Sequence, residues 1–291
     1  MITFINLGKY GRLGNQLYQY AALKSCSLKN KYICKIPDIS NTYWHGQKCL
    51  LNNFQLTSEL LTQEDISSIR HEISEPIGFT GEYLNILENI KDNTNINGFF
   101  QNTKYFLEYE KEIKNEFNFK EDLLRKEIDF INNLKEDKYD LVSLHIRTGD
   151  MTDGTNSIYN KYYGKHPLDK NSVFGNYINN ALEYFSELKN IKILVFVGGS
   201  RTGDDSSDIR MAKNYFNDSK FIVNDSNEPM TDFIRISLCN HNIISFSSTF
   251  SWWAAFLNKN INKTVICPKN FHIEKNTSCN NYFYPKEWIQ I

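Results

Sequence analysis

Short apolar runs alternate with stretches of helical periodicity along the whole chain. The apolar runs predict buried strands at residues 2–7, 32–36, 96–100, 141–144, 191–197, 221–223, 242–245 and 265–266. Apolar residues at helical spacing predict helices over residues 17–23, 62–72, 83–91, 104–117, 121–134, 173–188, 209–216 and 230–239, with another from 252 onward. Strands that alternate with helices over the full length are typical of α/β proteins with parallel sheets.

The charged segment Lys135–Lys138 is the clearest break in this pattern. It predicts an N-terminal domain over residues 1–138 and a C-terminal domain over residues 139–291, with a cleft between two strand-and-helix units. The polar segment 151–170, which contains three tyrosines, is long for a structureless connection. We therefore expect it to act as a binding loop or lid.

Composition and charge narrow the class of protein. A chain of 291 residues with 41% hydrophobic and 14% aromatic content can fill one large core or two ordinary ones. The net charge of −1 and the scattered basic residues do not resemble a nucleic-acid-binding surface. We find no signal peptide and no run of about eighteen apolar residues, so a cytoplasmic protein is expected. Its six cysteines contain no C-x-x-C pair, which favours reduced thiols.

Three loops that follow predicted strands carry groups suited to an anion. The first, G-K-Y-G-R-L-G-N-Q, ends in Gly14, Asn15 and Gln16 at the start of a helix, where backbone N–H groups can face a phosphate. Its glycine spacing matches neither the dinucleotide motif nor the Walker motif. A plain tight turn is the alternative.

The second loop closes the stretch D-L-V-S-L-H-I-R-T-G-D. It delivers His145, Arg147 and Asp150 into a turn beyond a buried strand. Ligands of open α/β sheets bind at the carboxyl ends of strands. Arg147 is the foremost candidate, because its planar guanidinium is always charged and suits a phosphate.

The third loop places four hydroxyls before an apolar helix, at Ser247, Ser248, Thr249 and Ser251. One helix cap requires only one such residue, so the cluster predicts ligand binding with capping as the alternative. Trp252 and Trp253 lie within the apolar helix and are expected in the core, and His241 is expected to be structural. The loop acids Asp204, Asp205 and Asp208 contain no D-x-D and are expected to be solvated, so we assign no metal.

These residues carry a resemblance to the bacterial α-1,2-fucosyltransferases. G-R-L-G-N-Q-L-Y-Q-Y-A is similar to the family's G-G-L-G-N-Q-x-x-Q-Y-A, and H-I-R-T-G-D resembles the H-x-R-R-x-D element shared with α-1,6- and protein O-fucosyltransferases. I-N-G-F-F-Q-N-T-K-Y-F, S-L-C-N-H-N-I-I-S-F-S-S-T-F-S-W-W and the ending P-K-E-W-I match further family motifs. The resemblance runs from residue 5 to the C-terminus.

The resemblance implies a GT-B-like fold of two Rossmann-like domains, with an acceptor side in the first and a nucleotide-sugar site in the second. It implies inverting transfer of L-fucose from GDP-β-L-fucose to the 2-hydroxyl of a terminal β-galactoside in surface glycan or O-antigen synthesis. No metal or cofactor is expected. Peripheral contact with a membrane or a lipid-linked acceptor is expected. The implied catalytic residues are Arg147, which stabilises the leaving phosphate, and Asp150, either a general base or a partner of Arg147. The implied donor-binding residues are Gly14, Asn15, Gln16, His145, Arg147, Asp232, Ser247, Ser248, Thr249 and Ser251.

The chain also departs from the family pattern. Thr148 stands where the motif has a second arginine. The family's S-D-D-x-x-W-x-K is matched at residues 206–213, displaced behind an extra G-G-S-R-T-G-D-D. Asp232 matches an acidic family position, with a solvated helix surface as the alternative. Two functions compete with this one: transfer from another donor such as GDP-colitose, and phosphoryl transfer through His145. The acceptor glycan is not determined by the sequence.

Overall fold

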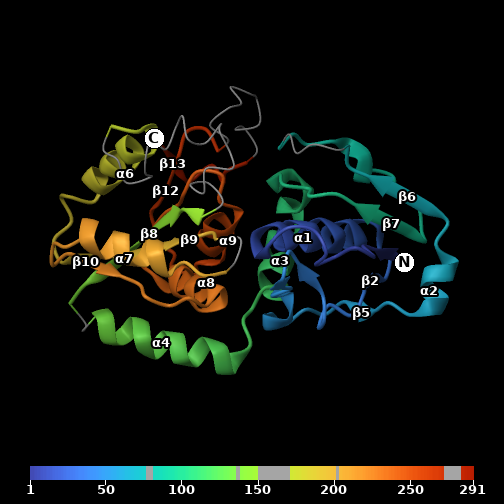
Figure 1. Ribbon diagram of the computed structural model, residues 1–291. Helices are drawn as coiled ribbons and strands as arrows, with labels where there is room; N and C mark the ends of the chain where they lie inside the picture. The colour runs from blue at the N-terminus through green and yellow to red at the C-terminus, as the bar shows by residue number, and fades with distance from the viewer. Residues whose placement is uncertain (77–80, 136–137, 150–170, 201–202, 272–282) are drawn as a thin grey trace. The chain divides into compact units, whose positions relative to one another are not determined.

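The computed structural model describes residues 1–76, 81–135, 138–149, 171–200, 203–271 and 283–291 (Figure 1). The chain forms two compact units. The first comprises Met1–Lys120 with Thr277–Pro285, and the second comprises Glu121–Asn276 with Lys286–Ile291.

The first unit is built on a parallel five-stranded sheet in the order β5-β2-β1-β7-β6. Its strands are β1 (Ile2–Thr3), β2 (Cys34–Ile36), β5 (Glu59–Leu60), β6 (His71–Ser74) and β7 (Thr94–Asn97). A small antiparallel hairpin pairs β3 (Tyr43–Trp44) with β4 (Gln47–Lys48). The α-helices are α1 (Leu13–Asn30), α2 (Gln63–Ser68) and α3 (Glu110–Glu116), and the 3₁₀ turns are Leu51–Asn53, Asn85–Leu87, Thr103–Tyr105 and Leu107–Tyr109.

The second unit contains a parallel six-stranded sheet in the order β10-β9-β8-β11-β12-β13. Its strands are β8 (Asp140–Arg147), β9 (Ile191–Gly198), β10 (Phe221–Val223), β11 (His241–Ile243), β12 (Val265–Cys267) and β13 (Ile289–Gln290). Its helices are α4 (Glu121–Lys135), α6 (Val173–Tyr184), α7 (Ser206–Tyr215), α8 (Pro229–Leu238) and α9 (Thr249–Leu257).

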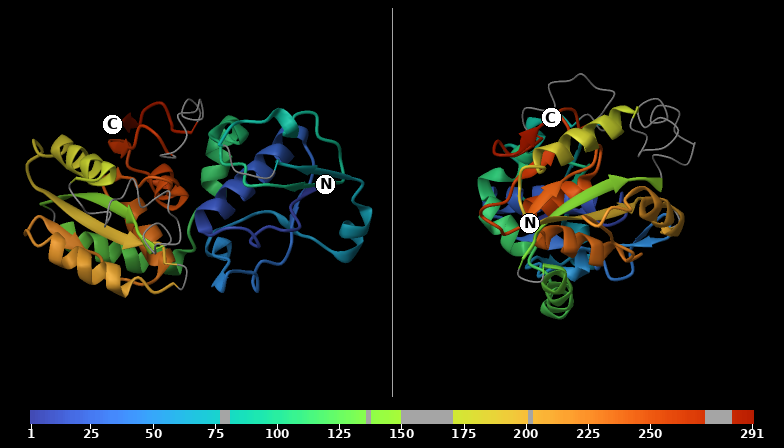
Figure 2. Two further views of the ribbon diagram at one scale, coloured as in Figure 1. Left: turned by 45° about the horizontal axis from the view of Figure 1, so that its top comes forward. Right: turned by 90° about the vertical axis from the view of Figure 1, so that its left-hand side faces the viewer.

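The side chains of β8 pack on both faces of the second sheet, because successive residues of a strand face opposite sides. Val142, Leu144 and Ile146 join the core formed with α6 and α7. On the other face, Ser143 accepts a hydrogen bond from Asn242 Nδ2, which also donates to Ile236 O of α8. Helices therefore cover both faces of the second sheet (Figure 2).

Aromatic side chains dominate the core of the first unit. Phe4 and Phe100 meet edge to face with ring centroids 6.3 Å apart, and Tyr18 contacts Phe106 at 5.9 Å. The C-terminal part of the chain contributes as well, because Phe283 lies 6.1 Å from the Tyr18 ring. The segment that follows belongs again to the second unit, where Trp288 lies 5.3 Å from Trp252.

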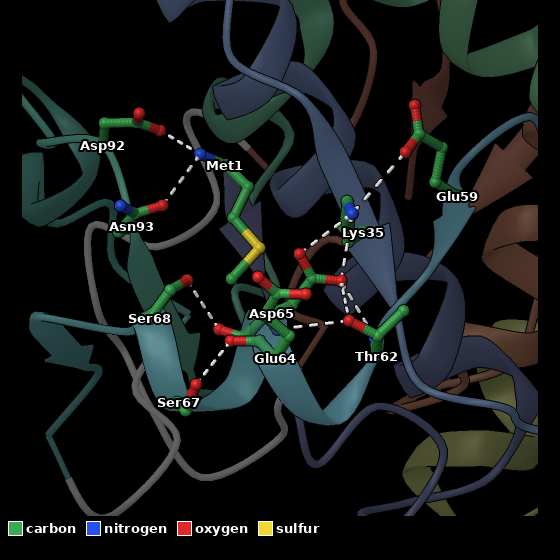
Figure 3. Close-up of polar contacts among 10 residues, drawn as sticks. All are labelled: Met1, Lys35, Glu59, Thr62, Glu64, Asp65, Ser67, Ser68, Asp92 and Asn93. Carbon is green, nitrogen blue, oxygen red and sulfur yellow. Dashed lines mark hydrogen bonds and ion pairs between the residues drawn. The ribbon is translucent and has the colours of Figure 1, made fainter.

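Polar contacts tie α2 to β2 and the N-terminus to the loop before β7 (Figure 3). Thr62 and Asp65 form a capping box at the start of α2, with Asp65 N donating to Thr62 Oγ1 at 3.1 Å. The Asp65 carboxylate also receives Lys35 Nζ of β2 at 2.9 Å. The hydrogen bond from Thr62 N, followed by that from Lys35, lowers the pKa of Asp65 to about 2. The N-terminal ammonium of Met1 binds Asp92 and Asn93 in the loop before β7.

Most predicted elements are present, and the largest differences lie in the first unit. The helix predicted over 62–72 ends at Ser68, and residues 71–74 form β6, whose largely exposed side chains give no apolar signal. The helix predicted over 83–91 is only a 3₁₀ turn, since Asn89 turns left-handed at φ 59°. The pattern also missed β3, β4, β5 and β13, each two residues long.

The unit boundary lies before α4 rather than at residue 138. A buried ion pair explains this, because Arg235 Nε of α8 lies 2.6 Å from Glu127 Oε2 of α4. The Arg235 guanidinium also stacks 3.5 Å above the ring of Phe130. These contacts make α4 part of the second unit.

Two further observations concern the described residues only. Cys26, Cys34, Cys49, Cys239 and Cys267 are all buried free thiols. Over the same residues, every helix is too short or too polar to span a bilayer.

Candidate active site

The second sheet contains a switch point between β8 and β11. The chain moves from β8 through β9 to β10 on one side, then returns to place β11 on the other side of β8. Loops that leave two adjacent strands in opposite directions leave the carboxyl ends of those strands open to a ligand. His145 and Arg147 lie at the carboxyl end of β8, and the serine cluster follows β11, so the topology brings these candidates to one place.

Arg147 is fixed by contacts across this switch point. Its backbone N–H donates to Ser245 Oγ at 2.9 Å, and its guanidinium Nη1 donates to the carbonyl of Ser247. Arg147 is the last residue of β8 and is half-buried. The side chain is thus held at the strand end with its charge directed to the loop after β11.

The hydroxyls of the serine cluster serve mainly to build this loop. Ser248 caps α9 by accepting from Ser251 N at 3.2 Å, and Ser251 Oγ accepts from Ser245 N at 3.2 Å. Ser247 adopts the left-handed conformation at φ 49°, and its N–H and Oγ both donate to Phe271 O. Thr249 is the half-buried first residue of α9. The capping alternative therefore holds for Ser248, while Thr249 and the helix terminus remain suited to an anion.

His145 lies two residues before Arg147 and on the same face of β8. Its Nδ1 is 3.4 Å from Ser248 Oγ, and its ring lies 5.6 Å from that of Phe250. The imidazole is buried, with 7% of its surface exposed. It is held against the first turn of α9 rather than in bulk solvent.

Asp232 belongs to a polar chain that begins in α4. Arg235 binds Glu127 and also donates to Asn224 Oδ1 at 2.7 Å, and Asn224 Nδ2 donates to Asp232 Oδ1 at 2.6 Å. Burial raises the pKa of the Asp232 carboxyl to about 7, although the hydrogen bond from Asn224 and the charge of Arg235 oppose the shift. Asp232 is thus a carboxyl that titrates near neutral pH.

The Gly-rich loop of the first unit follows β1, the central strand of its sheet. Gln16 donates to Gly11 O at 3.0 Å and accepts from Leu50 N at 3.4 Å, so its amide holds the loop. Asn15 Oδ1 accepts from Gln101 Nε2 at 2.7 Å. A Cβ atom on Gly11 would lie 2.3 Å from Asn15 Nδ2, which requires glycine there.

The candidates thus fall into two groups, one in each unit. Gly14, Asn15 and Gln16 occupy the first turn of α1, while His145, Arg147, Asp232 and the hydroxyl cluster lie in the second unit. Asp150 and the loop expected over 151–170 lie outside the described residues. Among the residues that are described, no group of three His, Cys, Asp or Glu side chains could hold a metal ion.

Sequence reasoning overlooked three residues that build these groups. Ser245 binds Arg147 N, Gln101 orients Asn15, and Asn224 links Arg235 to Asp232. A signal existed for the first two, since Ser245 and Gln101 both lie within the motifs quoted above. The expectations for Trp252 and Trp253 are confirmed, because both are fully buried. His241 accepts from Thr264 N at 2.9 Å, as a structural residue would.

The strand order defines an α/β protein with two parallel sheets, and the candidates for binding an anion lie near strand ends in each unit. The family model for glycosyl transferase family 11 matches residues 3–291, and the chain therefore belongs to this family of glycosyltransferases. The expected α/β class with two parallel-sheet units, as in GT-B-like fucosyltransferases, is confirmed.

Similar proteins agree with this assignment. The chain is 27% identical to the O-antigen biosynthesis glycosyltransferase WbnK of Escherichia coli, over 92% of this chain and 95% of the relative. It is 26% identical to an alpha-1,2-colitosyltransferase of the same species, over 97% and 96%.

Solved structures share the fold. Fucosyltransferase NodZ from Bradyrhizobium gives a TM-score of 0.52 at 11% identity, covering 88% of this chain and 91% of NodZ. POFUT1 in complex with GDP gives 0.54 at 10% identity, covering 91% and 98%. A variant of FUT1 from Arabidopsis thaliana in complex with GDP gives 0.56 at 10% identity, covering 98% and 74%.

The raised pKa of Asp232 predicts a pH-dependent stability difference for Asp232→Asn. Since the folded-state pKa lies above the unfolded one, the carboxyl's stabilising contribution is present below about pH 4 and is lost as pH rises through about 7. Asparagine keeps an oxygen for Asn224 and cannot ionise. Urea unfolding should show that Asp232→Asn gains stability relative to wild type between pH 4 and 8. Asp129→Asn, at an exposed position of α4, is the control. A constant difference across this range would contradict the prediction.

Proposed function

We propose that this chain transfers L-fucose from GDP-β-L-fucose to the 2-hydroxyl of a terminal β-galactoside, with inversion at the anomeric carbon. The observation that carries the proposal is the position of Arg147, a fixed cation at the switch point of the second sheet. Nucleotides bind doubly wound sheets at this position. The names of the relatives, which include an O-antigen glycosyltransferase, and the GDP held by POFUT1 and FUT1 support the substrate class.

In this proposal, Arg147 acts on the leaving group. Negative charge grows on the β-phosphate of GDP as the bond to the sugar breaks, so a preset guanidinium stabilises the transition state more than the ground state. Its contact with the Ser247 carbonyl fixes the orientation of the guanidinium at the strand end. The first turn of α9, with Thr249 and the Ser248 cap, adds a helix N-terminus to the same place. No metal ion is assigned a role.

The other candidates take supporting roles in the donor site. His145, held between Ser248 and Phe250, orients the turn or the nucleotide. Asp232 offers an acceptor to a donor N–H group, and Gly14 and Asn15 offer backbone and amide groups in the first unit. Gln16, Ser247, Ser248 and Ser251 hold their loops through the hydrogen bonds described above. Transfer to a lipid-linked repeat at the inner face of the membrane would fit these substrates.

A second donor is favoured by one specific observation. The relative whose printed name is alpha-1,2-colitosyltransferase covers 97% of this chain at 26% identity. Colitose is, like fucose, a 6-deoxyhexose carried on GDP, so GDP-colitose is the alternative donor. The phosphoryl-transfer hypothesis is not carried forward, because the chain belongs to a glycosyltransferase family.

Substitution of Arg147 tests the leaving-group role. We expect Arg147→Ala to lower kcat by about 10²–10³-fold, the scale for losing one donor that stabilises developing charge. Arg147→Lys should recover part of this loss, because lysine keeps the charge but not the planar fork. Arg210→Ala, at an exposed position of α7, is the matched control and should leave kcat unchanged. Turnover near the wild-type value in folded Arg147→Ala would refute the role.

A donor and acceptor panel tests the reaction itself. GDP-fucose and GDP-colitose should each be assayed against lactose, Galβ1,3GalNAc and lipid-linked galactosides, with and without EDTA. We expect turnover of GDP-fucose, an α-1,2 linkage in the product by NMR, and activity that survives chelation. Turnover of GDP-colitose alone would replace fucose by colitose as the transferred sugar. Loss of activity with EDTA would count against the metal-free mechanism.

Asp150 is proposed as the general base that accepts the proton of the acceptor hydroxyl, with orientation of Arg147 as the alternative. Asp150→Asn separates these roles. Loss of a base should lower kcat strongly and remove the acidic limb of the pH–rate profile. Loss of an orienting group should instead raise the KM for the donor and leave the profile in place, and this outcome would exclude the base role.

A further inference from the structure

The loop after β9 contains a carboxylate bound to backbone. Asp205 Oδ1 accepts from Gly199 N at 3.1 Å and from Ser200 N at 2.8 Å. A Cβ atom on Gly198 would lie 2.8 Å from Asp205 Oδ2, so the carboxylate lies directly over the end of the strand. Asp205 immediately precedes α7, and its own N–H donates to Asn227 Oδ1 at 3.3 Å. It is therefore not the solvated loop acid that the sequence indicated.

The backbone that Asp205 holds is the backbone on which the Arg147 turn rests. Thr148 N donates to Gly198 O at 2.9 Å. Gly149 turns left-handed at φ 61°, and a Cβ atom there would lie 2.2 Å from Ser200 N and 2.3 Å from Gly199 C. The two loops thus meet backbone to backbone with no room for a side chain. A shift of Gly199–Ser200 must move Thr148–Gly149, the residues that directly follow Arg147.

We propose that Asp205 is a positioning residue, which fixes the loop after β9 against the Arg147 turn and thereby sets the affinity of the site for the donor's diphosphate. Asp205 acts through the Gly199 and Ser200 amides and does not touch the donor. The inference rests on the proposed function, because it assumes that Arg147 binds the diphosphate. Asp205 is the last residue of the extra G-G-S-R-T-G-D-D segment of this chain, so the proposal assigns a function to that segment.

Asp205 also influences the second candidate of the same strand-end region. Asn224, Arg235, Asp205 and Ser226 are the groups that act on the pKa of the Asp232 carboxyl, and the negative charge of Asp205 raises it. Removal of this charge alone should lower the pKa of Asp232. This shift depends on the charge of Asp205 alone, so it checks that the two carboxylates lie close together and is independent of the hydrogen bonds to Gly199 N and Ser200 N.

Two substitutions at position 205 separate the hydrogen bonds from the charge. Asp205→Ala removes the oxygen that accepts both hydrogen bonds, and we expect it to weaken the binding of GDP by about tenfold or more in isothermal titration calorimetry. Asp205→Asn keeps an amide oxygen for Gly199 N and Ser200 N. Because these two hydrogen bonds are then weakened rather than lost, the GDP affinity of this variant should stay within about threefold of the wild-type value. Asp204→Ala is the matched control, since the neighbouring carboxylate is exposed and binds Ser206 rather than the strand-end amides.

Two further measurements on these variants require no donor. Hydrogen exchange should be faster in Asp205→Ala, but not in Asp205→Asn, for peptides that cover residues 141–149 and 191–200. The ¹³C titration of the Asp232 carboxyl should move to lower pH in Asp205→Asn. Equal GDP affinity and equal exchange in wild type and folded Asp205→Ala would overturn the positioning role. Absence of GDP binding by the wild-type protein would instead overturn the proposed donor class, while the exchange experiment would still test the contact between the two loops.

Discussion

The switch point between β8 and β11 is the constraint on which the second unit depends. Two adjacent parallel strands send their chains in opposite directions, so the strand ends are bridged only by side chains and by the loops themselves. Ser245 Oγ accepts from Arg147 N, and Ser251 Oγ accepts from Ser245 N, which links the end of β8 to the first turn of α9 through two serines. Ser245 joins the two bonds because its hydroxyl accepts from Arg147 while its own backbone N–H donates to Ser251. The guanidinium of Arg147 then completes the link through the Ser247 carbonyl.

A buried polar chain gives the same unit its second fixed element. Glu127, Arg235, Asn224 and Asp232 are joined in sequence by hydrogen bonds of 2.6–2.7 Å from α4 to the start of α8. Buried charges are costly unless each is paired and hydrogen-bonded, and here every link has a partner. The last member of this series is Asp232, where burial raises the pKa of the carboxyl to about 7 despite the hydrogen bond from Asn224. Because Arg235 binds Glu127 and its charge also lowers the pKa of Asp232, the ion pair at one end and the proton affinity of Asp232 at the other are coupled.

The sequence predicted the parts of the fold that depend on apolar periodicity and failed where polar contacts decide. The strands β9 and β10 and the helix α4 were predicted within one residue at each end, because apolar residues recur in them at strand or helix spacing. Only the first half of β8 was predicted, since His145 and Arg147 were assigned to a turn but belong to the strand. The membership of α4 in the second unit could not be predicted, since Glu127 is indistinguishable in sequence from a solvated helix acid. β6 was missed because its edge position leaves its side chains exposed. Among the candidate residues, the motifs located Arg147 and the serines. They could not show that Ser245 makes the bond to Arg147, nor that Ser248 and Ser251 bind within their own loop while Ser247 binds the carbonyl of Phe271.

Thr148 shows how this chain can build its site around a single arginine. The motif of the related fucosyltransferases has a second arginine at this position, but Thr148 is 1% exposed and its backbone is bound to Gly198. A guanidinium in that place would need a partner and more volume than a threonine occupies. The close approach of Gly149 to Gly199 and Ser200 leaves the loop after β9 where it can support the turn through backbone contacts instead. Rigidity of the Arg147 turn would then replace a second charge, and the carboxylate of Asp205 would maintain that rigidity from the far side of the loop.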